Sequence, residues 1–316
     1  MTIAMSREQW LASRRKGIGG SDIAALLGLT QYKTPYQLWL EKTARETSDE
    51  TSEPAYWGNR LEDIVADEFS RRSGLKVQRV NQILVGQEDW MLGNIDRAVI
   101  NPDIAKRVYL KDGRITTNQI LECKTASGWL QKLWGDNAES IPDYYLTQCQ
   151  WYMGNTQTEI CHAAVLIGGQ QFRRYQIKFD PELFGLLVTE ARRFWFEHVK
   201  ADIPPEPTTI GDCLHLWAKQ DPASILEASP ELVELVASYK DLKADIDAAG
   251  DELEQLKIQI MQHVKEAETV VHNGSKLLTF KAQESTRLDS KALKAAHPDL
   301  FQQFAKTSAT RVLRLV

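Results

Sequence analysis

Hydrophobic residues recur along the chain with two different periods, and each period predicts a different kind of element. Spacings of three and four residues, typical of amphipathic helices, recur in several segments before residue 201. Polar capping residues and nearby Gly or Pro set the ends that we expect for these helices. The helices predicted in this way span residues 7–13, 21–28, 33–42, 55–74, 144–155 and 181–201.

The fourth of these segments shows the helical pattern in a clear form. Leu61, Ile64, Val65 and Phe69 are expected to lie on one face of the helix. Gly74 follows the last periodic residue, at the position where helices commonly end.

A spacing of two residues predicts β-strands in the middle of the chain. Asp112-Gly113 and Gly168-Gly169 are turn signals, and each is expected to join two strands into a hairpin. The order of helices, strands, a helix, strands and a helix favours an α/β or α+β fold with helices on both sides of a sheet. The predicted strands span residues 76–85, 90–100, 106–110, 115–125, 159–169 and 171–179.

The character of the sequence changes after the Pro-rich run at residues 204–207, which we interpret as a domain boundary. Three parts are therefore expected: a domain over residues 1–207, a helical segment over 208–268, and a hairpin with a basic tail over 269–316. Asn273-Gly274 marks the turn of that hairpin.

The helical segment carries a heptad pattern that is typical of coiled coils. Gly250 lies within it and is expected to divide it into two helices. A partner-binding or self-association role is one interpretation of this pattern, and a simple packing appendage is the other. One heptad position holds Leu232, Tyr239, Ile246, Leu253 and Ile260, and the other holds Leu235, Leu242, Ala249 and Leu256.

The composition of the 316 residues is that of a soluble globular protein, with a formal net charge of −5. No apolar run approaches the roughly 18 residues of a membrane-spanning helix. The first residues lack the layout of a signal peptide, so we expect a cytoplasmic protein. The four cysteines show no CxxC spacing, which argues against a disulfide framework, a zinc site or an iron–sulfur cluster. A negative net charge still permits DNA binding through a local basic surface.

Charged residues interrupt the apolar run of one predicted strand, in the stretch ILECKTA. Glu122 and Lys124 are two residues apart, so their side chains share one face of a strand. Asp96 belongs to an earlier predicted strand, and the three side chains converge if the strands are neighbours. Two carboxylates can hold Mg²⁺ through oxygen, and a Lys beside them can orient or activate a water and offset charge on a phosphate. By themselves, these residues also fit the solvated end of a strand.

The glycine-rich segment RRKGIGGSD is a second candidate site. Ser21 is expected to cap a helix whose first turn contains Asp22. A helix start behind a glycine-rich turn can bind an anion, and Arg14 or Arg15 can add a bidentate phosphate contact. The spacing favours Arg15 without separating the two arginines firmly, and an ordinary capped helix is the alternative.

The order of these motifs resembles the PD-(D/E)xK nuclease superfamily: a Glu on a helix, an Asp on a strand, ExK on a later strand, then QxxxY on a helix. More closely, it is similar to the YqaJ-like viral recombinase and lambda exonuclease family, whose opening Arg, Gly-containing turn and Ser-Asp are also present. The resemblance covers about residues 6–200, although Ile95 stands where the superfamily name has Pro. The matching residues are Glu62, Asp96, Glu122, Lys124, Gln148 and Tyr152.

The resemblance implies a restriction-endonuclease-like fold, with a mixed central sheet flanked by helices, and a role for each matching residue. Asp96 and Glu122 would bind metal together with the backbone carbonyl of Cys123, and Lys124 would be the catalytic lysine. Glu62 would bind or position a second metal ion or the attacking water.

Three further roles follow from the same resemblance. Gln148 would position the site, with Tyr152 beside it. Arg15, or Arg14 in its place, would hold the 5′-phosphate of a DNA end together with Ser21.

The implied activity is a Mg²⁺-dependent 5′-to-3′ exonuclease on linear double-stranded DNA, which leaves 3′ single-stranded tails for phage-type recombination by single-strand annealing. Two Mg²⁺ ions are implied, which Mn²⁺ can replace. A homotrimeric ring and a single-strand annealing partner protein are also implied.

Two other functions compete with this one. A structure-specific DNA endonuclease of the same superfamily would not need a free 5′ end. An inactive DNA-binding or assembly protein would have no reason to keep Asp96, Glu122 and Lys124 together. An iron–sulfur nuclease is disfavoured because the cysteine clusters are absent.

The aromatic residues after the ExK strand are expected to be mostly core. Trp129 and Trp134 are the two that we would test for stacking on an unpaired base. Lys132 and Arg97 are expected to be surface charges, with contact to the DNA backbone as the alternative.

Overall fold

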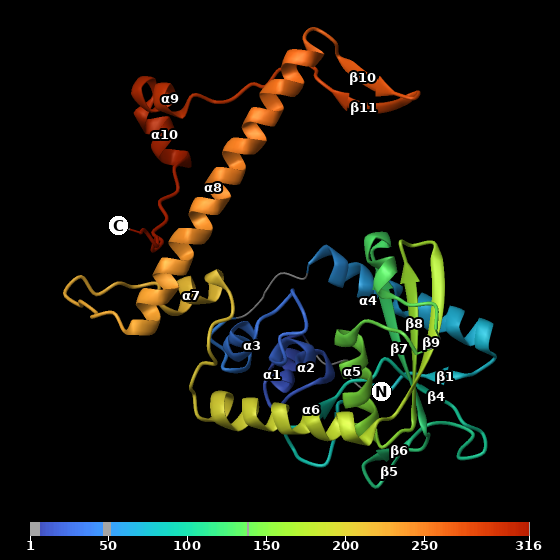
Figure 1. Cartoon of the computed structure of the whole chain (residues 1–316). Helices are drawn as coiled ribbons and strands as arrows, with labels where there is room; N and C mark the ends of the chain where they lie inside the picture. The colour runs from blue at the N-terminus through green and yellow to red at the C-terminus, as the bar shows by residue number, and fades with distance from the viewer. Residues whose placement is uncertain (1–6, 47–51, 138, 316) are drawn as a thin grey trace. The chain divides into compact units, whose positions relative to one another are not determined.

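A five-stranded mixed sheet is the centre of the first of two units (Figure 1). In the computed structural model, residues 7–46, 52–137 and 139–315 are described. Neighbouring strands run antiparallel except β7 and β8, which are parallel. The order across the sheet is β1 (Val77–Gln78), β4 (Arg97–Val99), β7 (Gln119–Ala126), β8 (Ile160–Ile167) and β9 (Gln171–Lys178). The predicted α/β fold with a mixed sheet is confirmed.

One face of the sheet is covered by α4 (Glu53–Ser73), whose Val65, Ala66 and Phe69 pack against strand residues. Gly74 ends the helix with a φ of 76°, as predicted. The prediction for Ile64 was wrong, because this side chain is 57% exposed. At 100° per residue, the buried stripe runs through Val65, Ala66 and Phe69 and leaves Ile64 on its flank.

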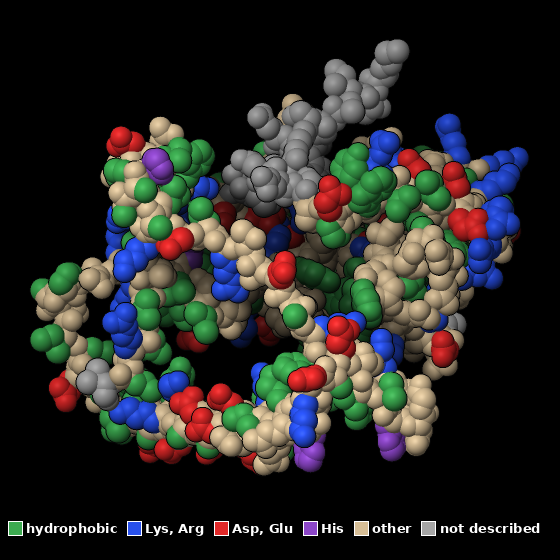
Figure 2. Space-filling model, turned by 90° about the horizontal axis from the view of Figure 1, so that it is seen from above, with side chains coloured by type: hydrophobic (Ala, Val, Ile, Leu, Met, Phe, Trp, Pro, Cys, Tyr) green, Lys and Arg blue, Asp and Glu red, His purple; other side chains and the backbone are tan. Residues whose placement is uncertain are grey.

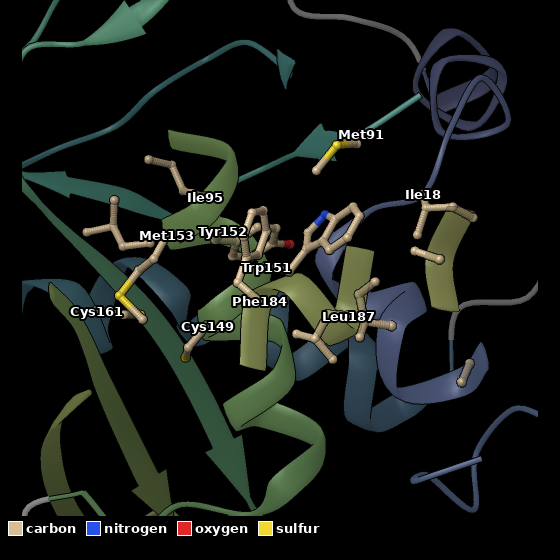
Figure 3. Packing of buried hydrophobic residues seen from close by; sticks show 14 of the residues in the cluster. Ile18, Met91, Ile95, Cys149, Trp151, Tyr152, Met153, Cys161, Phe184 and Leu187 are labelled. Carbon is tan, nitrogen blue, oxygen red and sulfur yellow. The ribbon is translucent and has the colours of Figure 1, made fainter. Parts of the chain in front are cut away.

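The opposite face is covered by α2 (Gly20–Leu26), α5 (Asp143–Thr156) and α6 (Pro181–Arg193). The core there is rich in aromatic and sulfur-containing side chains, with Trp151, Phe184 and Leu187 close together (Figure 3). α5 connects β7 to β8, and such a crossover allows two successive strands to lie parallel.

The strands predicted over residues 76–85 and 90–100 were too long. Each run contains two short strands: β1 and β2 (Leu84–Val85) in the first, β3 (Leu92–Gly93) and β4 in the second. β2 pairs only with β3, outside the main sheet.

Both hairpins predicted for the first unit are confirmed. β5 (Leu110–Lys111) and β6 (Arg114–Ile115) meet at Asp112-Gly113, where φ is 52° and 79°. β8 and β9 meet at Gly168-Gly169, where φ is 59° and 70°. A positive φ at both turn positions is what Gly and Asp tolerate and most residues do not.

The remaining helices of the first unit are short. They are α1 (Arg7–Arg14), α3 (Pro35–Lys42), the 3₁₀ turn η1 (Gly128–Leu133), the π-helical turn η2 (Phe194–Lys200) that continues α6, and α7 (Ile210–Leu216).

The first unit ends at Leu216, so α7 belongs to it and the predicted limit at residue 207 falls before this helix. Two side-chain hydrogen bonds hold α7 against α3. The Thr34 hydroxyl donates to Asp212 Oδ1 (3.0 Å), and the Tyr36 hydroxyl lies 2.9 Å from His215 Nδ1.

The second unit starts at Trp217 and is dominated by α8 (Pro230–Val264). The predicted break at Gly250 was wrong, since α8 is continuous. A Gly inside a helix costs only about 1 kcal/mol, and a 35-residue helix tolerates that cost. The other elements are β10 (Thr269–His272), β11 (Ser275–Thr279), α9 (Ser290–Ala296) and α10 (Pro298–Phe304).

The predicted hairpin turn at Asn273-Gly274 is confirmed, with φ of 49° and 78°. None of the described helices combines the length and the apolar character that crossing a membrane requires.

Candidate active site

Side-chain alternation along β7 decides which residues meet at the centre of the first unit. Leu121 packs in the cluster under α4, and its neighbours on either side point to the α5 face. Glu122 and Lys124 therefore share the α5 face, and Glu122 is 3% exposed. The predicted same-face pair is present: Lys124 Nζ lies 2.7 Å from Glu122 Oε1. It lies under α5 and not at a solvated strand end.

Asp96 reaches the same place because β4 is the neighbour of β7, as the sequence predicted. Pairing between the two strands begins at Arg97 and Leu121, one residue after Asp96. Beyond that pair, the Asp96 side chain takes the position of a strand partner. Its Oδ2 accepts a hydrogen bond of 2.7 Å from the backbone N–H of Cys123.

Gln148 of α5 connects the acidic and the basic group. Its Nε2 donates to Glu122 Oε1 (2.6 Å) and lies 3.3 Å from the Tyr152 hydroxyl. Its Oε1 accepts from Lys124 Nζ (3.1 Å). Gln148 and Tyr152 are one turn apart on α5, so the QxxxY spacing places both on the face that meets β7. The structure thus brings Asp96, Glu122, Lys124, Gln148 and Tyr152 together.

The electrostatics of this group are those of buried carboxylates with too little positive charge. Burial raises the pKa of Asp96 well above its ordinary value, and the charges of Glu122 and Glu62 raise it further. Burial also raises the pKa of Glu122, although Lys124 opposes this effect. Burial lowers the pKa of Lys124, but Glu122 and Asp96 outweigh it and raise that pKa above its usual range. A bound cation would stabilise the negative charge of both carboxylates and so lower the pKa of each.

The donor set fits a divalent metal ion. Glu122 Oε2 is buried and has no hydrogen-bond partner among the described residues. A buried carboxylate oxygen without a partner is costly unless a cation binds it. Carboxylate oxygens are the ligands that Mg²⁺ prefers, and Asp96 faces the same space. No cluster of three His, Cys, Asp or Glu side chains within the described ranges is arranged as a complete metal site.

Glu62 does not join the other carboxylates in this structure. Its Oε1 accepts a hydrogen bond of 2.5 Å from Arg97 Nη1 and lies 3.5 Å from Arg79 Nη2. Arg97 also pairs with Asp63 and donates to the backbone oxygen of Asp96 (2.5 Å). The expectation that Arg97 is a surface charge was wrong, because it is 5% exposed. It pairs with Leu121 across the sheet and so faces α4, where both acids lie.

The glycine-rich segment forms a second cluster at the start of α2. The predicted N-cap was wrong: the cap is Gly19, and its N–H donates to Asp22 Oδ2 (2.8 Å). The Ser21 hydroxyl is therefore not used for capping. Arg14 Nη2 lies 2.9 Å from both Ser21 Oγ and Asp22 Oδ1.

Lys42 completes this cluster, and sequence reasoning missed it. Its Nζ lies 2.6 Å from Asp22 Oδ2 and donates to the Arg14 backbone oxygen (2.8 Å). The Lys42 and Asp22 side chains are 1% and 2% exposed. Burial alone raises the pKa of Asp22, but Lys42 and Arg14 outweigh it and hold that pKa well below the ordinary range. No local pattern distinguishes Lys42 from a solvated lysine at a helix end.

The cluster of Arg14, Asp22 and Lys42 at the start of α2 lies beside the group that contains Glu122 and Tyr152. A Cβ on Gly20 would come within 2.5 Å of the Tyr152 ring, so only Gly lets α2 approach α5 this closely. A cavity of about 50 Å³ lies at this junction. Its lining includes Arg14, Ser21, Asp22, Asn94 and Tyr152, whereas Arg15 is not among the lining residues.

Of the aromatic residues expected to be mostly core, three are buried, namely Trp134, Trp151 and Tyr152, whereas Tyr144 and Tyr145 are half-buried and Trp129 is exposed. Trp134 is 2% exposed and cannot stack on a base, whereas Trp129 is 94% exposed. Tyr145, expected in the core, lies at the edge of the acidic group. The Lys124 ammonium lies 4.6 Å from the centre of its ring, in the geometry of a cation–π contact.

Comparisons with known proteins agree with the sequence resemblance. Residues 9–159 match the model of the YqaJ-like viral recombinase domain. The uncharacterized protein YqaJ of Bacillus subtilis (strain 168) is 35% identical over 315 residues, which cover 97% of this chain and 93% of that protein.

Two solved structures are more distant. An alkaline exonuclease (LHK-Exo) from Laribacter hongkongensis is 18% identical with a TM-score of 0.47, over 62% of this chain and 94% of that one. A phage related exonuclease from Haemophilus somnus 129PT is 12% identical with a TM-score of 0.40, over 59% and 96%. The extent and identity of the match to YqaJ decide the assignment: the chain belongs to the YqaJ-like viral recombinase family.

Proposed function

We propose that the protein is a Mg²⁺-dependent exonuclease that degrades the 5′-ended strand of linear double-stranded DNA and leaves 3′ single-stranded tails. The observation that carries this proposal is the buried group of Asp96, Glu122, Lys124 and Gln148, in which Glu122 Oε2 has no partner among the described residues. Family membership is consistent with a role of these tails in recombination by single-strand annealing.

Asp96 and Glu122 would hold the metal ion, together with the backbone carbonyl of Cys123, and Mn²⁺ could replace Mg²⁺. Such an ion lowers the pKa of a bound water and offsets charge on the phosphate. Glu62 is available for a second ion only if it leaves Arg97, to which it is bonded here.

Lys124 supplies a positive charge that the protein holds in place. Glu122 and Gln148 fix its ammonium from two sides, and Tyr145 covers it from a third. A preorganised charge of this kind stabilises the negative charge that builds up on the phosphate during hydrolysis. Gln148 is hydrogen-bonded to both Glu122 and Lys124 and holds the two side chains in place, so it acts as a positioning residue.

The cavity at Ser21 is suited to a terminal phosphate. Arg14 and Lys42 carry two positive charges against the single negative charge of Asp22, which leaves an excess of one positive charge. The Ser21 hydroxyl and the Arg14 guanidinium line the same cavity. Tyr152 lines this cavity, and its hydroxyl lies 3.3 Å from Gln148 Nε2, which also donates to Glu122. A 5′ end bound in the cavity would therefore lie close to the proposed metal ligands.

The rest of the proposal concerns the substrate and the assembly. Lys and Arg side chains gather along one edge of the face seen in Figure 2, so the net charge of −5 is not spread evenly. Such an edge can contact the phosphate backbone of a duplex. The resemblance adds a homotrimeric ring and a single-strand annealing partner to the proposal.

Digestion of matched linear and circular duplexes tests the function directly. We expect linear DNA to be shortened from its 5′ ends with Mg²⁺ and to remain intact with a chelator, because Asp96 and Glu122 need the ion to act. The reaction is followed with strands labelled at either end. Digestion that resists the chelator would contradict the proposed chemistry. Circles cut as fast as linear DNA would replace the exonuclease with an endonuclease.

Mutation can show which of the two arginines before the glycine-rich turn, Arg14 or Arg15, binds the 5′-phosphate. Arg14→Ala should remove most of the preference for a 5′-phosphate over a 5′-hydroxyl end, since a lost charge-assisted contact costs roughly tenfold or more in binding. Arg15→Ala is the matched control and should keep the preference, because Arg15 does not line the cavity. The measurement compares the rates on the two ends for each variant. The opposite ranking would return the role to Arg15.

A further inference from the structure

The second unit leaves its longest apolar surface uncovered. Val264 is the only buried side chain among the described residues from 217 to 315. Leu235, Leu242 and Ile246, on the heptad face of α8, are 67%, 61% and 62% exposed. Neither the β10–β11 hairpin nor α9 and α10 covers this face (Figure 1).

The uncovered face has the form of a coiled-coil seam. Both heptad positions are apolar from Leu232 to Leu256, and α8 stays helical throughout because Gly250 does not interrupt it. At 1.5 Å per residue, its 35 residues span roughly 52 Å. A seam that repeats every seven residues stays aligned only with another helix of the same repeat. A sheet or an irregular surface would not follow it over that length.

The charges beside the seam identify the partner helix. If the position of Leu235 is written d, Lys243 and Lys257 occupy e positions, and Asp245 and Glu252 occupy g positions. One flank of the seam is thus basic and the other acidic. Within the described residues, neither Lys257 nor Glu252 forms an ion pair inside the chain, so both are free for a partner.

We propose that α8 forms a parallel, in-register coiled coil with the α8 helix of a second copy of this chain. In a parallel pair, a g residue faces the e residue of the next heptad on the partner helix. Glu252 then faces Lys257 of the partner subunit, and the same contact forms a second time by symmetry. An antiparallel pair would instead put lysine beside lysine and acid beside acid.

The proposal goes beyond nuclease activity and does not rest on it. It joins two copies through the second unit, at a distance in sequence from the site residues, so this pairing is a contact separate from the ring of three copies proposed above. The β-branched Ile246 and Ile260 at a, with Leu242 and Leu256 at d, are the combination that favours two strands in parallel coiled coils.

Cysteine cross-linking in the full-length protein tests this pairing locally. Ala249→Cys lies in the seam, and Ala244→Cys lies on the outer face of the same helix. Under mild oxidation we expect Ala249→Cys to yield disulfide-linked pairs of chains and Ala244→Cys only traces, because a disulfide requires Cα atoms closer than about 7 Å. Equal linking of both variants, or linking of neither, would overturn the proposal. The unchanged protein controls for its own four cysteines.

Charge reversal then tests the orientation, in the Ala249→Cys background. Lys257→Glu places acid opposite acid in the parallel pair, so half-maximal cross-linking should need about fivefold more protein. Adding Glu252→Lys should restore the original value, since the pair is then reversed rather than broken. If Lys257→Glu instead increased cross-linking, the helices would be antiparallel and the proposal would fail. An unchanged value would likewise contradict the proposed contact between residues 252 and 257.

Discussion

Replacing Lys124 with Ala should reduce the rate of DNA hydrolysis by about 10²–10³-fold, the usual cost of removing one preorganised charge from a developing transition state. Among the described residues that contact the Lys124 ammonium, Gln148, Tyr145 and Glu122 carry no positive charge that could replace it. The single-turnover rate on a linear duplex with saturating Mg²⁺ measures the effect without interference from product release.

Two further variants separate the chemistry from the fold. Lys132→Ala removes an exposed lysine of η1, a few residues further along the chain, and should leave the rate unchanged. Lys124→Arg keeps the charge and should recover part of the loss. The thermal unfolding midpoint of each variant is recorded alongside. A Lys124→Ala protein that digests DNA at the normal rate would refute the proposed mechanism.

Replacing Asp22 with Ala should lower the free energy of unfolding of the first unit by about 3–5 kcal/mol. Lys42 would then be a buried charge without its partner, and breaking a buried ion pair from one side costs that much. The remaining contact of Lys42, to the Arg14 backbone oxygen, cannot neutralise the ammonium. Arg14 would lose one of its two anchors beside the cavity, so the preference for 5′-phosphate ends should weaken as well.

Asp202→Ala is the matched control for this measurement. It breaks a bidentate pair with Arg45 of similar length, 2.6 and 2.8 Å, but on the exposed surface. Water screens that pair, so its loss should change stability little. Urea titrations followed by tryptophan fluorescence compare the two variants, since the first unit holds most of the tryptophans. Equal shifts for Asp22→Ala and Asp202→Ala would show that burial of the pair carries no special weight.

The sequence predicted the elements that are governed by local rules. Gly74 ended α4, and Asp112-Gly113, Gly168-Gly169 and Asn273-Gly274 formed turns, because a positive φ is a property of single residues. Element order and periodicity were enough for the fold class. They failed for strand length before β7, because how far two strands pair depends on neighbours that are remote in sequence.

At the candidate site, sequence and tertiary structure contributed different things. The sequence determined that Glu122 and Lys124 share a face and that Gln148 and Tyr152 share another, since both spacings follow from strand and helix geometry. Only the tertiary structure decided that β4 lies beside β7 and that α5 closes over them.

The same division explains what the sequence could not predict. Lys42, Arg97 and Glu62 have ordinary local surroundings, and their partners come from other elements. Arg97, expected at the surface, is buried in an ion pair with Glu62, and Lys42, for which the sequence made no prediction, is buried in an ion pair with Asp22. Glu62 therefore bonds to Arg97 and not to the group around Asp96. The sequence by itself determined which residue types were available at which spacing. Tertiary packing decided which charges lost their water, and the energy of a charge depends on that loss more than on its place in the chain.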